Sequence, residues 1–135
     1  MHQCEALIIA CMDFRFRTAI RRLLVNLGLR DDYDMVSCAG ATMDLTNGDD
    51  GARQFILKQI RISIEKHGIQ KVYIVHHLDC GAYGGHTAFA SLEAEKLRHI
   101  EDMKKARDVI MSTFPELTVI LMLASRSGEV AIEEV

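Results

Sequence analysis

A chain of 135 residues with 49% hydrophobic and 26% charged content can bury one sizeable core, so we expect residues 1–135 to form a single globular domain. The net charge of -3, with the basic residues scattered among acids, excludes a basic stripe and argues against nucleic acid as a partner. The longest apolar runs, residues 6–12 and 117–124, fall under half of the roughly 20 residues that span a bilayer, so we expect no membrane partner. The N-terminus resembles no secretion signal, which predicts a cytoplasmic protein.

The first half of the chain alternates between patterns typical of strands and helices. Residues 6–10 form a short apolar run that predicts a strand buried on both faces, and helical spacing predicts a helix over residues 18–27. Residues 34–39 predict a second strand, which a long polar loop follows. Asp49 or Asp50 then caps a helix that ends at residues 66–68.

The second half repeats the alternation. Residues 71–76 predict a third strand, and the turn after it contains Gly81, Gly84 and Gly85. A helical region extends over about residues 87–113, as one helix or two. Residues 117–124 predict a fourth strand, and the tail around Val130 and Ile132 could add an edge strand.

This alternation predicts an α/β fold: a doubly wound, mainly parallel four-stranded sheet in the order 2-1-3-4, with helices on both faces and a possible fifth edge strand. In that order the winding reverses between strands one and three. Ligands of such folds bind beyond the carboxyl ends of those two strands. Cys11 and His77 lie at these ends, so the topology and the residue chemistry indicate the same place.

Cys11, His77 and Cys80 form a candidate zinc site. Zinc binds thiolate and imidazole tetrahedrally, and catalytic sites use three protein ligands with water in the fourth position. The chain lacks a Cys-x-x-Cys pair, which lowers the odds of thioredoxin-like redox chemistry. His76 and His77 are adjacent in a strand and point to opposite faces, so we expect at most one of them to be a ligand and the other to be a structural histidine.

Asp13 and Arg15 follow the first cysteine closely. Asp13 could fill the fourth zinc position and close the site. Alternatively, charge-assisted hydrogen bonds from Arg15 would hold its carboxylate off the metal, where it would orient zinc-bound water. We expect a switch between these two states, although an ordinary surface pair is the alternative interpretation.

The remaining thiols and a histidine carry weaker signals. We interpret Cys4 and Cys38 as small buried side chains, because free cysteine is among the most buried residue types. Cys38 ends the second strand and could therefore line the site. His86 could shuttle protons, but a solvent-exposed helix N-terminal residue is the simpler interpretation.

The motifs Cys11-x-Asp13-x-Arg15 and His77-x-x-Cys80-Gly81 resemble the two signatures of the β-class carbonic anhydrases, in the form of the compact prokaryotic branch. The resemblance implies a zinc lyase that hydrates carbon dioxide reversibly to bicarbonate, with zinc-bound hydroxide as nucleophile. It also implies one zinc ion per chain on Cys11, His77 and Cys80, with Asp13 and Arg15 as a dyad. A small-molecule substrate and a homodimer or larger homo-oligomer follow from the same likeness.

The sequence leaves two alternatives open. Related family members hydrolyse carbonyl sulfide or carbon disulfide with the same ligands, and a pocket lined by Cys38, Phe14 and Phe16 could favour such substrates. The protein could also be a non-catalytic, zinc-stabilised binding or regulatory domain.

Overall fold

The computed structural model describes residues 2–127 and 129–135, and it contains one five-stranded sheet in the order β2-β1-β3-β4-β5. The strands are β1 (Ala6–Cys11), β2 (Tyr33–Cys38), β3 (Lys71–His77), β4 (Thr118–Ser127) and β5 (Glu129–Glu134). The first four strands are parallel, and β5 pairs antiparallel with β4 at the edge. The predicted fold class, strand order and fifth edge strand are therefore confirmed.

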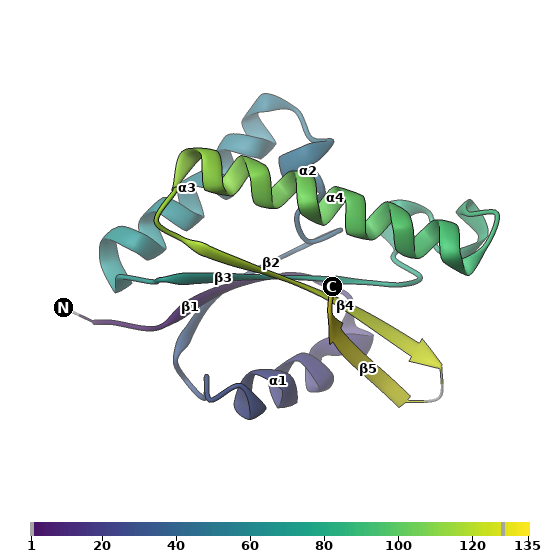
Figure 1. Cartoon of the computed structure of the whole chain (residues 1–135), viewed down its shortest axis with the longest axis horizontal. Coiled ribbons are helices and arrows are strands. Elements are labelled where there is room, and N and C mark those ends of the chain that lie inside the picture. Colours follow the sequence, from purple (N-terminus) through teal and green to yellow (C-terminus); the bar gives the residue numbers. More distant parts are fainter. Residues whose placement is uncertain (1, 128) are drawn as a thin grey trace.

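Helices cover both faces of this sheet (Figure 1). α1 (Arg17–Asn26) packs on one face, whereas α2 (Met43–Thr46), α3 (Asp50–His67) and α4 (Leu92–Thr113) lie on the other. Among the described residues, no helix is both long and apolar enough to cross a membrane.

Strand β1 illustrates how a parallel sheet is covered on both faces. All six of its residues are buried. Leu7 and Ile9 pack in the core beneath α3 and α4, while Ile8 packs in the core beneath α1. Because successive side chains of a strand point to opposite faces, a continuous apolar run can fill both cores at once.

The helix ends follow local chemistry, with one correction. The Asp49 side chain accepts a hydrogen bond from the Ala52 amide at 2.8 Å, and Gly68 ends α3 with a φ of 64°. α4 begins at Leu92 rather than near residue 87, because the Ser91 hydroxyl caps it by accepting from the Ala94 amide. The preceding residues His86–Ala88 form a separate 3-10 turn.

The loop after β2 is more structured than the sequence indicated, since it contains the short helix α2. Gly40 begins this loop with a φ of 71°, and an added Cβ would lie 2.9 Å from Met43 Cβ and 3.1 Å from Ala82 Cβ. Glycine therefore allows α2 and the turn after β3 to approach closely, which brings the loop against the candidate site.

Candidate metal centre

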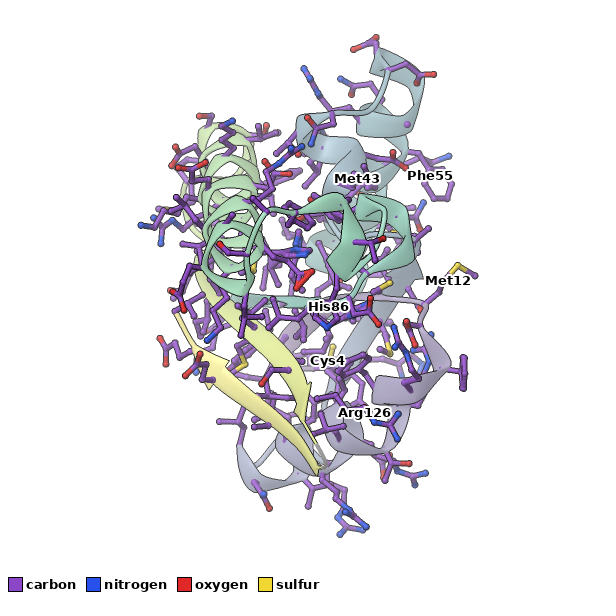
Figure 2. All side chains as sticks on the ribbon, turned by 90° about the vertical axis from the view of Figure 1, so that its right-hand side faces the viewer. Cys4, Met12, Met43, Phe55, His86 and Arg126 are labelled. Carbon is purple, nitrogen blue, oxygen red and sulfur yellow. The ribbon has the colours of Figure 1, made fainter. Side chains whose placement is uncertain are left out.

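Cys11, His77 and Cys80 meet at the carboxyl edge of the sheet, which faces the viewer in Figure 2. Cys11 ends β1, His77 ends the neighbouring strand β3, and Cys80 lies in the turn that follows. Each residue contributes one potential ligand atom, these atoms lie within 4.8 Å of one another, and all three residues are buried. The sequence prediction that these residues converge is confirmed, while their role as ligands remains a prediction.

The geometry of the three side chains fits a tetrahedral metal ion. The sulfurs of Cys11 and Cys80 are 3.9 Å apart. Two sulfurs bound at about 2.3 Å to a tetrahedral zinc would be about 3.8 Å apart. Little movement is therefore needed to place an ion between them.

The orientation of His77 adds an independent indication. Its Nδ1 lies 2.8 Å from the carbonyl oxygen of Leu78, which fixes the proton on Nδ1 and leaves a lone pair on Nε2. Nε2 is buried and finds no hydrogen-bond partner within residues 2–127 and 129–135. A buried nitrogen without a partner is costly unless it binds a ligand, and a metal ion would satisfy it.

The two thiols behave as a pair that shares one proton. The hydrogen bond from Cys80 is the main cause that lowers the pKa of Cys11, and the same hydrogen bond raises the pKa of Cys80. Burial lowers the pKa of His77, but the neighbouring Cys11 sulfur and the Leu78 carbonyl outweigh burial and raise the pKa overall. The site thus already favours a negative sulfur at Cys11, which a bound cation would stabilise.

Asp13 is held by Arg15 and points toward the cluster. Arg15 donates to Asp13 from its backbone amide (2.9 Å), from Nε (3.0 Å) and from Nη2 (2.8 Å). These hydrogen bonds hold the pKa of the Asp13 carboxyl at about 2. Asp13 Oδ2 remains 3.8 Å from His77 Nε2, so this structure has the carboxylate held by arginine, one of the two states expected from the sequence.

Asp79 is a member of the site that was not predicted from the sequence. Arg15 Nη1 donates to Asp79 Oδ2 at 3.0 Å, and Arg15 Nη2 donates to the Asp79 carbonyl at 2.8 Å. Asp79 has a positive φ of 57°, which is uncommon outside glycine. The sequence signal for Asp79 was an acidic residue inside the tight turn between His77 and Cys80. The fold then places this residue against the guanidinium of Arg15.

The apolar surroundings of the metal centre differ partly from those expected. Phe16 packs against the His77 ring with centroids 4.4 Å apart, as a pocket wall would. Phe14 is 84% exposed and does not line the site within the monomer. The thiol of Cys38 donates to the Ala41 carbonyl at 3.0 Å, and burial raises its pKa. Cys38 therefore supports the loop beside the site, and the expected wall of Cys38, Phe14 and Phe16 is only partly formed.

A buried polar network backs the turn that carries Cys80. His76 contacts Thr42 Oγ1 at 2.7 Å through Nε2 and His99 Nδ1 at 3.0 Å through Nδ1, which confirms its structural role. Tyr83 donates to Asp102 Oδ2 at 2.8 Å and stacks near His99. The sequence signal was the spacing of Glu95, His99 and Asp102, which places three polar residues on one buried face of α4.

This network predicts a pH dependence of stability. Burial lowers the pKa of His99 from 6.5 to about 4. The unfolded state then binds the proton more tightly than the folded state does. The contribution of neutral His99 to the free energy of unfolding is therefore greatest above pH 6.5, and it falls by about 3 kcal/mol as the pH drops to about 4. We expect urea denaturation to show this loss in the wild type and a smaller loss in His99→Phe. The control His2→Gln removes an exposed imidazole and should match the wild type; equal losses in all three proteins would contradict the prediction.

His86 is neither a plain surface residue nor part of the cluster. Its Nδ1 lies 2.7 Å from Oε1 of Glu95, a carboxylate that is almost fully buried, while the His86 side chain is half exposed. His86, Arg15, Lys96 and Arg126 contribute to the wall of a cavity of about 300 Å³ beside the site. A proton-relay role for His86 remains a prediction.

The mostly parallel sheet and the Cys, His and Cys cluster at its carboxyl edge define an α/β protein with a candidate metal centre. Residues 1–134 match the family described as "Putative carbonic anhydrase", and the chain belongs to this family. The resemblance seen in the sequence is thereby confirmed.

The chain is also similar to two relatives in sequence and to several solved structures in fold. Uncharacterized proteins of Rickettsia conorii and Rickettsia bellii are 34% and 33% identical to the chain; the matches cover 96% and 95% of it, and 72% and 80% of the relatives. The β-carbonic anhydrase CcaA superposes over the whole chain and 78% of its own length, with a TM-score of 0.62 and 14% identity. CafA of Aspergillus fumigatus covers 98% of the chain and 76% of its own length, with a TM-score of 0.58 and 17% identity. At these identities the solved structures show the fold.

Proposed function

We propose that the protein hydrates carbon dioxide reversibly to bicarbonate with one zinc ion held by Cys11, His77 and Cys80. The observation that carries this proposal is the buried Nε2 of His77, which has no hydrogen-bond partner in the described part of the chain. It lies beside two sulfurs 3.9 Å apart and 3.8 Å from the Asp13 carboxylate. Family membership supports the reaction class.

Zinc would supply the acidity, because it lowers the pKa of a bound water from about 15.7 to roughly 7 in the carbonic anhydrases that hold the ion with three histidines, a ligand set different from this one. The chain's own residues provide the positioning. The Leu78 carbonyl fixes the His77 ring, and Arg15 holds the Asp13 carboxylate as a hydrogen-bond acceptor at the edge of the cluster. Asp79 holds Arg15 from the other side, so the dyad is braced by both motifs.

The direct test is stopped-flow measurement of proton release when carbon dioxide is mixed with zinc-loaded protein. We expect a rate well above that of the same concentration of free zinc. A rate no better than free zinc would overturn the proposal and favour the non-catalytic zinc domain. Release of sulfide from carbonyl sulfide, without carbon dioxide hydration, would instead assign the hydrolase activity.

We also propose that the chain assembles with a second copy of itself along strand β2. β2 lies at one edge of the sheet. Exposed apolar side chains occur on and near this edge, at Met12 (59%), Phe14 (84%), Met35 (40%) and Phe55 (62%). Met12 and Phe55 point outward on the same side of the molecule in Figure 2. An apolar sheet edge invites pairing, and the β-carbonic anhydrases of Sordaria macrospora are described as tetrameric.

Met35→Lys should therefore weaken self-association, because it places a charge on the apolar edge strand. We expect the wild type to sediment as a dimer or larger and Met35→Lys to shift toward the monomer. Leu97→Lys is the matched control, since Leu97 is 57% exposed on α4. A wild type that stays monomeric at all concentrations would contradict the assembly.

A further inference from the structure

A second group of potential metal ligands lies at the opposite end of the sheet from the candidate metal centre. Cys4 precedes β1, Asp34 is the second residue of β2, and His67 is the last residue of α3. Their ligand atoms lie within 4.8 Å of one another. The segment that carries Cys4 enters at the side marked N in Figure 1, away from the turns that follow β1 and β3.

Contacts from three elements hold these side chains together. Asp34 Oδ2 lies 2.7 Å from His67 Nδ1 and accepts a hydrogen bond from Ser63 Oγ at 2.6 Å. The Cys4 amide donates to the His67 carbonyl at 3.0 Å, which ties the N-terminal segment to the end of α3. The Cys4 sulfur makes a long contact of 3.7 Å with the Ala6 carbonyl, and the Cys4 side chain packs against the apolar core beneath α3 and α4.

We propose that Cys4, Asp34 and His67 form a second metal site, for a borderline divalent transition-metal ion of the zinc class. A thiolate, an imidazole and a carboxylate are donors that such ions accept together, and hard ions such as magnesium disfavour the sulfur. The ligands would carry two negative charges, which balance a divalent cation. Ser63 would hold the Asp34 carboxylate from outside the site.

The exposure of the group suits an ion that enters from solvent. The side chains of His67 and Asp34 are 37% and 30% exposed. Three protein ligands with a solvent-facing side leave a fourth position for water. The buried cluster of Cys11, His77 and Cys80 contrasts with this open arrangement.

The alternative is a plain ion pair. A protonated His67 at the C-terminus of α3 would interact favourably with both Asp34 and the helix dipole. That interpretation gives Cys4 a packing role alone, as a small side chain against the core, although the fold places its sulfur next to the other two groups. The two interpretations differ in one measurable property, which is whether the Cys4 thiol becomes protected when metal is added.

The two sites are separate and can be counted independently. Cys4 and Cys11 are seven residue steps apart along a nearly extended chain, which corresponds to roughly 23 Å. A substitution at one site should therefore leave the metal at the other in place.

The test uses tag-free, full-length protein equilibrated with Zn²⁺ and then desalted. We expect about two zinc ions per chain in the wild type, and loss of one in Cys4→Ser and in His67→Gln. Cys38→Ser, which removes a half-buried thiol outside the group, should keep both. Bound zinc should also protect Cys4 from alkylation, read by mass spectrometry, in the wild type and in Cys80→Ser alike.

Three outcomes would overturn the second site: zinc content unchanged in Cys4→Ser and His67→Gln, Cys4 alkylated equally with and without zinc, or one zinc per chain that only Cys80→Ser removes. The count also separates this proposal from the proposed function. One zinc per chain that Cys4→Ser removes and Cys80→Ser leaves in place would support the second site while contradicting the catalytic one. Thermal unfolding of each metal-free variant confirms that it folds.

Discussion

Cys80→Ser is expected to abolish carbon dioxide hydration and to remove the metal ion from the candidate centre. The substitution replaces one of two sulfurs that face each other at 3.9 Å with a poorer, shorter ligand. Loss of a residue that merely supports a ligand costs 10- to 100-fold in metal affinity, so loss of a ligand itself should cost more than about 100-fold. The measurements are zinc content after desalting and stopped-flow proton release.

Cys38→Ser is the matched control for this variant. Cys38 pairs in register with Cys11 and carries the same thiol, but its sulfur donates to the Ala41 carbonyl. The Cys38→Ser variant should keep its zinc and most of its carbon dioxide hydration activity. If Cys80→Ser hydrated carbon dioxide at the wild-type rate, the assignment of the ligands would be wrong.

The second large effect concerns the dyad of Asp13 and Arg15. Asp13→Asn should lower kcat/KM about 100-fold while zinc content stays unchanged, because a positioned proton acceptor contributes 100-fold or more. Arg15→Ala should lower kcat/KM by a similar factor for a different reason. Without its arginine, the Asp13 carboxylate, now 3.8 Å from His77 Nε2, is free to move to the metal and close the site.

The pKa of Asp13 distinguishes misplacement of its carboxylate from a change in its protonation. Arg15 holds the pKa of Asp13 at about 2, and its removal should let that pKa rise toward the ordinary 3.8. Asp13 therefore stays ionised at neutral pH in both proteins, and the loss in Arg15→Ala comes from misplacement of the carboxylate.

A double variant of Asp13 and Arg15 should have a kcat/KM no lower than that of either single variant, since both substitutions act through one carboxylate. Fully multiplicative losses would show that the two residues act separately.

Much of this protein was determined by local features of its sequence. The buried run that became β1 and the apolar run that became β3 placed Cys11 and His77 at strand ends, and the alternation of elements put those strands side by side. The periodicity of strands and helices is a property of a few consecutive residues, so the sheet order and the convergence of the cluster could be predicted. The start of α4 was misplaced because a single hydroxyl, that of Ser91, sets it.

The tertiary structure alone decided which distant side chains meet. The contacts of Arg15 with Asp79, of His76 with His99, and of His67 with Asp34 join residues 64, 23 and 33 positions apart. Each depends on how a turn or helix packs across the sheet, and no spacing along the chain encodes that packing. The sequence by itself therefore determined a cluster at the carboxyl edge. The turn after β3 decided the brace on Arg15, the packing of α4 decided the buried network behind the cluster, and the packing of α3 decided the second group of ligands at the opposite end of the sheet.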